Sequence, residues 1–377
     1  MRVLLVEPYH GGSHGAWADG YAAASRHEVT LITHQARFWK WRMHGAHLTL
    51  AREAEETFAD GPPDVVVASS MMDVAGFAGA ARRVLGDAPL VVYFHENQFT
   101  YPLSHRDRPD LTYPMINWSA AATADVVAFN SEFHRRDFLD GARRFLRQFP
   151  DHRHGPMVTD VEARSVVLPV GVDLARLRGH RPPEGGSPLV LWNQRWEHDK
   201  DPDAFVRAVT GLRGDGLRFR LAVAGERFVS IPTAFEELPR AFGDDLVWFG
   251  RAPEDVYVDL LRRTDIVVST ARHEFFGVAV VEAIAAGAFP VLPDRLVYPE
   301  RIPDDLADVC LYDDEEGLVE RLRTAIVDPG VRSRAVRLPE TMRRFDWSVV
   351  APRYDDLLER IGRRPPPAHA DGPSSGC

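Results

Sequence analysis

Short apolar runs alternate with amphipathic stretches from the first residues of the chain. In the first half, runs that fit buried strands lie at residues 3–7, 28–33, 64–69, 90–95, 125–130 and 165–169. Helical periodicity lies between them, for example over residues 73–85 and 132–149. Continuous apolar strands that alternate with helices predict a parallel sheet covered by helices on both faces.

The pattern stops at residues 179–188, where Pro and Gly predominate, and then begins again. Strands are predicted at residues 189–193, 219–224, 246–249, 265–269 and 289–292, and helices at 278–286, 315–327 and 347–361. We therefore predict an α/β protein of two Rossmann-like, doubly wound domains, residues 1–178 and 187–345, facing across a cleft. A helix over residues 346–362 is expected to pack back on the first domain, and the Pro-rich residues 363–377 are expected to be disordered.

Composition narrows the class of protein. Apolar residues make up 45% of the chain and charged residues 27%, as in ordinary soluble globular proteins. No apolar run reaches the roughly 18–20 residues that span a bilayer, and the first strand starts too close to Met1 for a signal peptide. Cys310 and Cys377 are too few for a disulfide framework or a zinc cage. We therefore expect a cytoplasmic protein that does not contact a membrane.

Charge is distributed unevenly along the chain, whose net charge is −10. Residues 1–178 hold 19 basic and 21 acidic residues, whereas residues 179–377 hold 26 and 34. An acidic chain argues mildly against nucleic-acid binding, but the nearly neutral first half leaves room for local basic patches.

Two segments of the first half are locally basic. Residues 34–52 contain no acid and interleave basic with aromatic residues: Arg37, Phe38, Trp39, Lys40, Trp41, Arg42 and Arg52. Residues 134–154 carry six arginines, among them Arg144 and Arg153, against three aspartates. Basic residues among aromatics suit phosphates and unstacked bases. The alternative is a solvated helix face whose tryptophans belong to the core or to a lid.

Polar residues follow two strands of the first half, where ligands of this architecture bind. The turn after the first strand contains Gly11, Gly12, Ser13 and His14 and opens a helix. Its glycines allow a ligand to approach the backbone closely, and the helix start favours an anionic group. The fourth strand ends in His95, Glu96, Asn97 and Gln98. Such side chains at the end of a buried strand suit proton transfer or hydroxyl binding. The alternatives are a purely structural turn for the glycine segment and a polar cap on the strand for residues 95–98.

Charged residues follow the first strand of the second half. Arg195 and Lys200 lie five positions apart across a predicted strand–helix turn, and Lys200 is one of only two lysines in the chain. An Arg fork and a Lys point charge at this spacing can converge on one phosphate group. Surface charges on an ordinary helix start are the alternative.

The segment after the strand at residues 265–269 carries the strongest signal. Phe276, Gly277 and Val278 begin a helix whose free amides can bind a phosphate. Glu274 stands just before this helix, and Glu282 lies within it among apolar neighbours. Two carboxylates that flank a phosphate-binding helix start fit the hydroxyls of a nucleotide-sugar.

With these residues in order, the chain resembles the retaining GT-B glycosyltransferases of family 4. Glu274 and Glu282 form its E-x₇-E motif, accompanied by the Arg195–Lys200 pair and the glycine turn. More narrowly, it resembles the tRNA-queuosine alpha-mannosyltransferase family, through the blocks at residues 93–98, 150–153, 195–202, 271–279 and 296–300. His10 replaces the aromatic residue that this family has before the glycines.

The resemblance implies a nucleotide-sugar donor, GDP-mannose, and retention at the anomeric carbon. It implies that Arg195, Lys200 and the amides of residues 276–278 hold the donor diphosphate, that Glu274 binds the sugar and that Glu282 binds the ribose. His95 is expected near the reacting sugar and Gly12 near the diphosphate or the acceptor. No metal or other cofactor is expected.

The acceptor implied by the resemblance is queuosine at the wobble position of tRNA, bound by the first domain. Its candidate contacts are Ser13, His14, Trp39, Lys40, Arg42, Glu96, Asn97, Arg144 and Arg153. Three alternatives stay open: transfer from the same donor to a small molecule, lipid or glycan, donor binding without turnover, and epimerisation of the donor.

Overall fold

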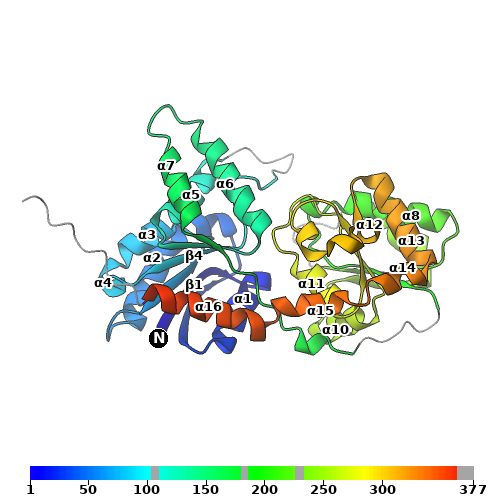
Figure 1. Ribbon diagram of the computed structural model, residues 1–377, viewed down its shortest axis with the longest axis horizontal. Coiled ribbons are helices and arrows are strands. Elements are labelled where there is room, and N and C mark those ends of the chain that lie inside the picture. Colours follow the sequence, from blue (N-terminus) through cyan, green and yellow to red (C-terminus); the bar gives the residue numbers. More distant parts are fainter. Residues whose placement is uncertain (103–109, 180–185, 226–232, 363–377) are drawn as a thin grey trace, which may run out of the picture.

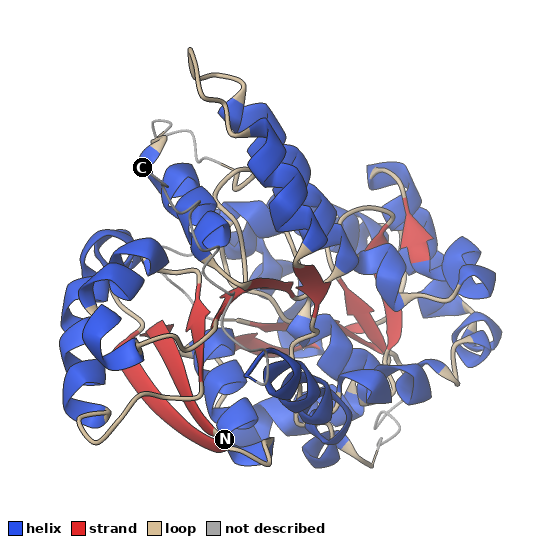
Figure 2. Cartoon of the chain, turned by 60° about the vertical axis from the view of Figure 1, so that its left-hand side comes forward, coloured by secondary structure: helices blue, strands red, loops and turns tan. Residues whose placement is uncertain are grey.

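The computed structural model describes residues 1–102, 110–179, 186–225 and 233–362, so the predicted disordered tail lies outside the described residues. Two six-stranded sheets form the frame of the molecule, and every strand pair in them is parallel (Figure 1). Helices enclose both sheets (Figure 2). The predicted pair of doubly wound α/β domains is confirmed.

The first sheet has the strand order β2-β1-β3-β4-β5-β6. Its strands are β1 (Arg2–His10), β2 (Glu28–Gln35), β3 (Val65–Ser69), β4 (Leu90–Phe94), β5 (Val126–Phe129) and β6 (Ser165–Val167). They are apolar along their length because helices cover both faces. Strand order reverses between β1 and β3, so the carboxyl ends of these two strands border the crevice where such sheets bind ligands, and β4 is the next strand.

The second sheet has the order β12-β11-β10-β7-β8-β9, which is that of the Rossmann fold. Its strands are β7 (Leu189–Trp192), β8 (Arg220–Ala224), β9 (Leu246–Gly250), β10 (Ile266–Val268), β11 (Phe289–Pro293) and β12 (Leu311–Tyr312). Here the strand order reverses between β7 and β10. The two charged segments singled out in the sequence follow these two neighbouring strands.

Helices connect the strands in both halves. The first half contains α1 (Gly12–Ala24), α2 (Trp39–Thr57), α3 (Val74–Ala80), α4 (Arg82–Leu85), α5 (Thr112–Thr123), α6 (Glu132–Leu146) and α7 (Gly155–Ala163). The second contains α8 (Pro202–Gly214), α9 (Leu238–Phe242), α10 (Glu254–Arg263), α11 (Val278–Ala285), α12 (Ala307–Cys310), α13 (Glu315–Val327), α14 (Pro329–Arg334), α15 (Leu338–Met342) and α16 (Trp347–Gly362).

Two of the predicted helices differ from those observed. The helix expected at residues 73–85 is two helices, α3 and α4, which meet at Ala81, and Gly76 and Gly79 lower the helix propensity of the first. The helix expected to reach residue 149 ends at Leu146. Strand β12 was not predicted, because two residues are too few to show a period.

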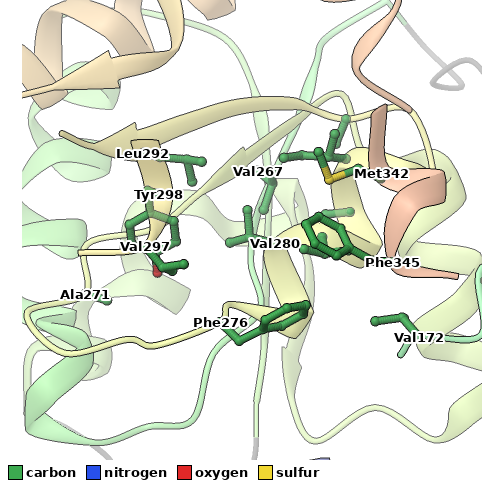
Figure 3. Close-up of a cluster of buried hydrophobic side chains, with 14 of the residues drawn as sticks. Val172, Val267, Ala271, Phe276, Val280, Leu292, Val297, Tyr298, Met342 and Phe345 are labelled. Atoms are coloured by element: carbon green, nitrogen blue, oxygen red, sulfur yellow. The ribbon is translucent and has the colours of Figure 1, made fainter. Parts of the chain in front are cut away.

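The chain passes between the two halves twice, and the two connections pair with each other. Val172 forms a bridge with Asp346, and its amide donates to the carbonyl of Phe345 at 2.8 Å. Figure 3 shows Val172 and Phe345 beside the apolar side chains of the second half, so its core continues into the connections.

Helix α16 returns to the first half of the molecule (Figure 1). Tyr354 accepts a hydrogen bond from the indole of Trp17 at 3.1 Å, and Tyr21 donates to Asp355 at 2.9 Å. At its start, Trp347 fills the space left by Gly20, where an added Cβ would lie 2.2 Å from the indole. Within the described residues, no helix is both long and apolar enough to cross a membrane.

Candidate active site

A buried carboxylate and two histidines meet at the carboxyl ends of β1 and β4. Oε2 of Glu7 lies 3.3 Å from Nδ1 of His14 and 3.7 Å from Nε2 of His95. The two imidazole rings are 4.1 Å apart between centroids, and Glu7 is completely buried. The predicted residues His14 and His95 are therefore brought together by Glu7, to which the sequence argument assigned no role.

The two histidines of this cluster have opposite protonation preferences. Burial lowers the pKa of His14, but the charge of Glu7, its hydrogen bond to His14 and the charge of Glu96 together leave that pKa above its ordinary value. Burial and the charge of His14 hold the pKa of His95 well below its ordinary value. Titratable neighbours whose pKa values are pushed apart divide into an acid and a base. At neutral pH, His95 is a neutral imidazole that can donate one hydrogen bond and accept another.

The same three side chains are the group with metal-ligand chemistry in the part of the chain that the structure describes. One ligand atom from each of Glu7, His14 and His95 lies within 4.8 Å of the other two. Imidazole and carboxylate are ligands that zinc accepts. These groups already have partners within the protein, since Glu7 pairs with both rings and its Oε1 accepts a hydrogen bond from the amide of Tyr9 at 2.8 Å.

Lys200 is buried between two carboxylates at the end of the turn after β7. Its ammonium lies 3.0 Å from Asp199 and 3.4 Å from Glu274, and it donates to the carbonyl of His273 at 2.6 Å. Burial opposes its charge, but Glu274 and Asp199 raise the pKa of Lys200. Lys200 therefore ties the turn after β7 to the loop after β10. Arg195 is the more accessible cation, with its side chain 45% exposed beside Glu197.

The carboxylate of Glu274 binds the amides at the helix start that was predicted to bind a phosphate. Its Oε1 accepts hydrogen bonds from the amides of Phe275, Phe276 and Gly277 at 3.0–3.2 Å. Gly277 has a left-handed backbone, with φ 78°, which a residue with a side chain rarely adopts. Although burial acts in the opposite direction, Lys200 and these amides lower the pKa of Glu274 to about 2. An anion-binding helix start is thus present, and its amides are bonded to a protein carboxylate.

Both oxygens of Glu282 have protein donors. Tyr257 of α10 donates to Oε2 at 2.9 Å, and Arg176 of the short helix at Ala175–Leu177 donates to Oε1. Asn193 donates in turn to the hydroxyl of Tyr257 at 3.1 Å and fixes its position. Burial raises the pKa of Glu282 despite these partners. Arg176 and Tyr257 were missed, because they come from the interdomain connection and from a helix without a motif.

The predicted acceptor residues occupy three different settings. Ser13 is exposed and lies directly after the glycine turn, whereas Glu96 is half-buried and lies just after β4. Asn97 is completely buried and fixes its own loop, since it donates to Asp137 and accepts from the amide of Phe99. Because the side chain is enclosed and both its oxygen and its nitrogen are bonded within the protein, a structural role for Asn97 is favoured over its predicted contact with the acceptor.

The two basic segments lie on different helices. Trp39, Lys40 and Arg42 belong to the start of α2, where Arg42 donates to the carbonyl of Gln35. Arg144 is exposed near the end of α6, and Arg153 follows in the exposed loop before α7. At 1.5 Å per residue, Arg144 is roughly 20 Å along α6 from the helix start that touches the second half.

The start of α6 contacts the second half directly. Ser131 donates to the carbonyl of Phe275 at 2.7 Å, and the ring of His134 stacks on that of Phe275 with centroids 4.0 Å apart. Glu300 accepts a 2.5 Å hydrogen bond from the amide of Phe133. These contacts hold the loop that carries Glu274 against the first half. Glu300 belongs to the block at residues 296–300 and was not predicted to be a site residue.

Comparisons with known proteins show the family and the fold class of this chain. Residues 2–172 match the family model "tRNA-queuosine alpha-mannosyltransferase N-terminal", and residues 176–342 match "Glycosyl transferases group 1". Among solved structures, sucrose-phosphate synthase from Thermosynechococcus elongatus superposes with a TM-score of 0.72 over 96% of this chain and 99% of that one, at 14% identity. Anabaena HepE in complex with UDP and glucose superposes with a TM-score of 0.68 over 95% of this chain and 99% of that one, at 15% identity.

The fold and the matched models define a glycosyltransferase of the GT-B class. A tRNA-queuosine alpha-mannosyltransferase of Drosophila melanogaster is 31% identical over 95% of this chain and 97% of its own length. The chain therefore belongs to the tRNA-queuosine alpha-mannosyltransferase family. It is also 24% identical, over 76% of its length and 80% of the relative's, to a GDP-mannose:cellobiosyl-diphosphopolyprenol alpha-mannosyltransferase of Xanthomonas oryzae.

Proposed function

We propose that this glycosyltransferase moves mannose from GDP-mannose onto queuosine in tRNA, with retention at the anomeric carbon. Membership of the family supports the acceptor, and the mannosyltransferases among the relatives support the sugar and its nucleotide. The reaction places the enzyme in the cytoplasm, where tRNA is modified.

One juxtaposition carries the proposal. Nε2 of His198, in the turn after β7, lies 3.2 Å from the carbonyl oxygen of Pro102, in the loop after β4, and the rings of Tyr101 and His273 meet edge-on with centroids 4.9 Å apart. The phosphate-binding chemistry after β7 therefore faces the acid–base cluster after β1 and β4. A sugar that joins a diphosphate at Arg195 to an acceptor at the first half would sit beside His95.

Donor binding divides among the residues that follow β7 and β10. Arg195 is proposed to bind the diphosphate as a two-pronged donor, and Lys200 adds a fixed positive charge behind it. Glu274 is ionised at any physiological pH, because its pKa is about 2, and so accepts hydrogen bonds from sugar hydroxyls. Glu282 is proposed to bind the ribose, which requires that Arg176 or Tyr257 share the carboxylate.

Retention requires that the acceptor attack from the face the diphosphate leaves. We propose that the leaving diphosphate, stabilised by Arg195 and Lys200 where negative charge develops, takes the proton of the attacking hydroxyl. Neutral His95 would orient a hydroxyl of the sugar, and no side chain is assigned as a covalent nucleophile. The two cations supply the charge stabilisation that a metal would otherwise give, so we propose that the reaction needs no metal.

Release of GDP from GDP-mannose tests this function. With queuosine-bearing tRNA, release is expected to be much faster than with the same tRNA lacking queuosine. Equal release from the two tRNAs would exclude queuosine as the acceptor. Cleavage of the product by an α-specific mannosidase, and not by a β-specific one, would establish retention.

A further inference from the structure

The start of α2 exposes two large aromatic side chains. Phe38 is 76% exposed and Trp41 is 64% exposed, with Arg37 and Lys40, also exposed, between and beside them. Exposed rings of this size contribute nothing to the core, so two of them in neighbouring positions indicate a surface that is covered by a ligand.

The backbone conformation of Phe38 strengthens this reading. Phe38 has a left-handed backbone, with φ 54° and ψ 54°, and its carbonyl accepts from the amides of Trp41 and Arg42 to begin the helix. Asn, Asp, Ser or Gly is favoured at the position before a helix, and a bulky residue in a left-handed conformation is strained. Folding therefore gives no reason for Phe at this position.

The surface borders the candidate active site. An added Cβ on Gly11 of the glycine turn would lie 2.6 Å from the Cβ of Ala36, two residues before Phe38. Trp39 packs in one cluster with Tyr9, and the ring of Tyr9 meets that of His14 edge-on at 5.9 Å. A ligand that covers Phe38 and Trp41 therefore lies one layer of side chains away from the acid–base cluster.

Charge along α2 favours a nucleic acid over a membrane. The exposed residues of its first turn are basic or aromatic, whereas Glu55 and Glu56 are exposed at its far end. A helix that lies on an anionic membrane is basic along its whole polar face. Here the exposed aromatic rings are confined to the end beside the glycine turn, and Arg52 near the far end stands close to the exposed Glu55 and Glu56, so the continuous basic and aromatic surface matches the size of a few nucleotides.

We propose that Phe38 and Trp41 stack on nucleobases of the RNA acceptor that flank the modified nucleoside, while Arg37 and Lys40 contact its phosphates. Aromatic side chains bind unstacked bases in this way without reading their sequence. The inference rests on the proposed function, because it takes the acceptor to be part of an RNA.

The test compares the variant F38A/W41A with the matched control L48A/V336A, in which two other exposed apolar side chains are shortened. Binding of a fluorescent anticodon stem–loop that carries queuosine is measured by anisotropy. We expect F38A/W41A to bind at least ten-fold more weakly than the control, with GDP binding unchanged in both. Equal RNA affinity in the two variants would overturn the proposal.

Two further measurements separate the possible failures. If the wild-type protein binds the stem–loop through Phe38 and Trp41 but transfers no hexose, the proposed function fails and the stacking surface stands. Sedimentation with phosphatidylglycerol vesicles tests whether an anionic membrane, and not RNA, covers Phe38 and Trp41. Vesicle binding that is lost in F38A/W41A, together with unchanged RNA binding, would assign the surface to a membrane and overturn the proposal.

Discussion

The carboxylate of Glu300, in the second half of the molecule, accepts a hydrogen bond from the amide of Phe133 at the start of α6, in the first half. A carboxylate at a helix N-terminus satisfies an amide that has no partner in the helix and interacts favourably with the helix dipole. Glu300 therefore fastens the two halves together beside the loop of Glu274.

Replacing Glu300 should loosen this attachment. We expect Glu300→Ala to lower the free energy of unfolding by about 1 kcal/mol, the usual effect of losing a helix cap, and to raise KM for the donor more than it changes kcat. Chemical denaturation and initial rates measure the two effects. Glu316→Ala, at an exposed helix start within the second half, is the control. Unchanged KM in Glu300→Ala would show that this contact does not serve donor binding.

Removal of the Glu282 carboxylate should weaken donor binding. Because a hydrogen bond to a charged group contributes roughly 1.5–3 kcal/mol, we expect Glu282→Ala to bind GDP about ten- to a hundred-fold more weakly. Tyr257→Phe keeps the carboxylate and removes one of its protein donors, so it should bind GDP nearly as well as the wild type. Calorimetric titration gives both affinities. GDP affinity that is unchanged in Glu282→Ala would exclude the ribose assignment.

Glu274 should make stability depend on pH in the acid range. Its pKa is about 2 in the folded protein and 4.5 ordinarily, so its contribution is complete above about 4.5 and is lost as the pH falls toward 2. We expect the unfolding free energy of the wild type to fall more steeply over this interval than that of Glu274→Gln. Urea denaturation at several pH values measures the difference. Parallel curves for the two proteins would contradict the depressed pKa.

The protonation of His14 should depend on Glu7. Against the effect of burial, the charge of Glu7 and its hydrogen bond to His14, helped by the charge of Glu96, keep the pKa of His14 above its ordinary value. In Glu7→Gln burial remains and the charge is gone, so the pKa of His14 should fall below the ordinary 6.5. Nuclear magnetic resonance of the ring protons follows this titration. A His14 pKa that stays raised in the variant would assign the effect to another group.

Chelation tests the metal-free mechanism. We expect enzyme dialysed against EDTA to retain its full rate of transfer, because Arg195 and Lys200 are proposed to neutralise the leaving diphosphate. Loss of activity that one divalent ion restores would contradict this mechanism. In that case Glu7→Gln and His14→Ala should weaken binding of the ion, since these side chains and His95 provide the metal-ligand group described above.

Much of the fold follows from local sequence. Residues such as Val65, Val66 and Val67 stand in short, β-branched apolar runs, a pattern typical of strands buried on both faces. Arg195, Lys200 and Glu274 could be expected together, because they follow β7 and β10 and these strands are neighbours in a Rossmann order. Element ends were less predictable, as the division of α3 from α4 shows.

The partners of the predicted residues could not be expected in the same way. Glu7 lies within a buried strand as one acid among many, and only the pairing of β1 with β3 and of β3 with β4 brings it to His95. Arg176 contacts Glu282 from the interdomain connection, and Tyr257 contacts it from α10. Contacts of this kind produce no periodic pattern or fixed spacing in the sequence. Local patterns therefore located the charged ligand candidates, whereas their supporting contacts depend on the packed structure.

The central claim is that this enzyme transfers mannose to queuosine in tRNA. Mass spectrometry of the nucleosides from queuosine-bearing tRNA, after incubation with the protein and GDP-mannose, tests it most directly. We predict that queuosine gains the mass of one hexose and that Glu274→Gln, in which the carboxylate proposed to bind the sugar is neutralised, produces much less of this product. Queuosine of unchanged mass, while GDP is released in the presence of another acceptor, would contradict it.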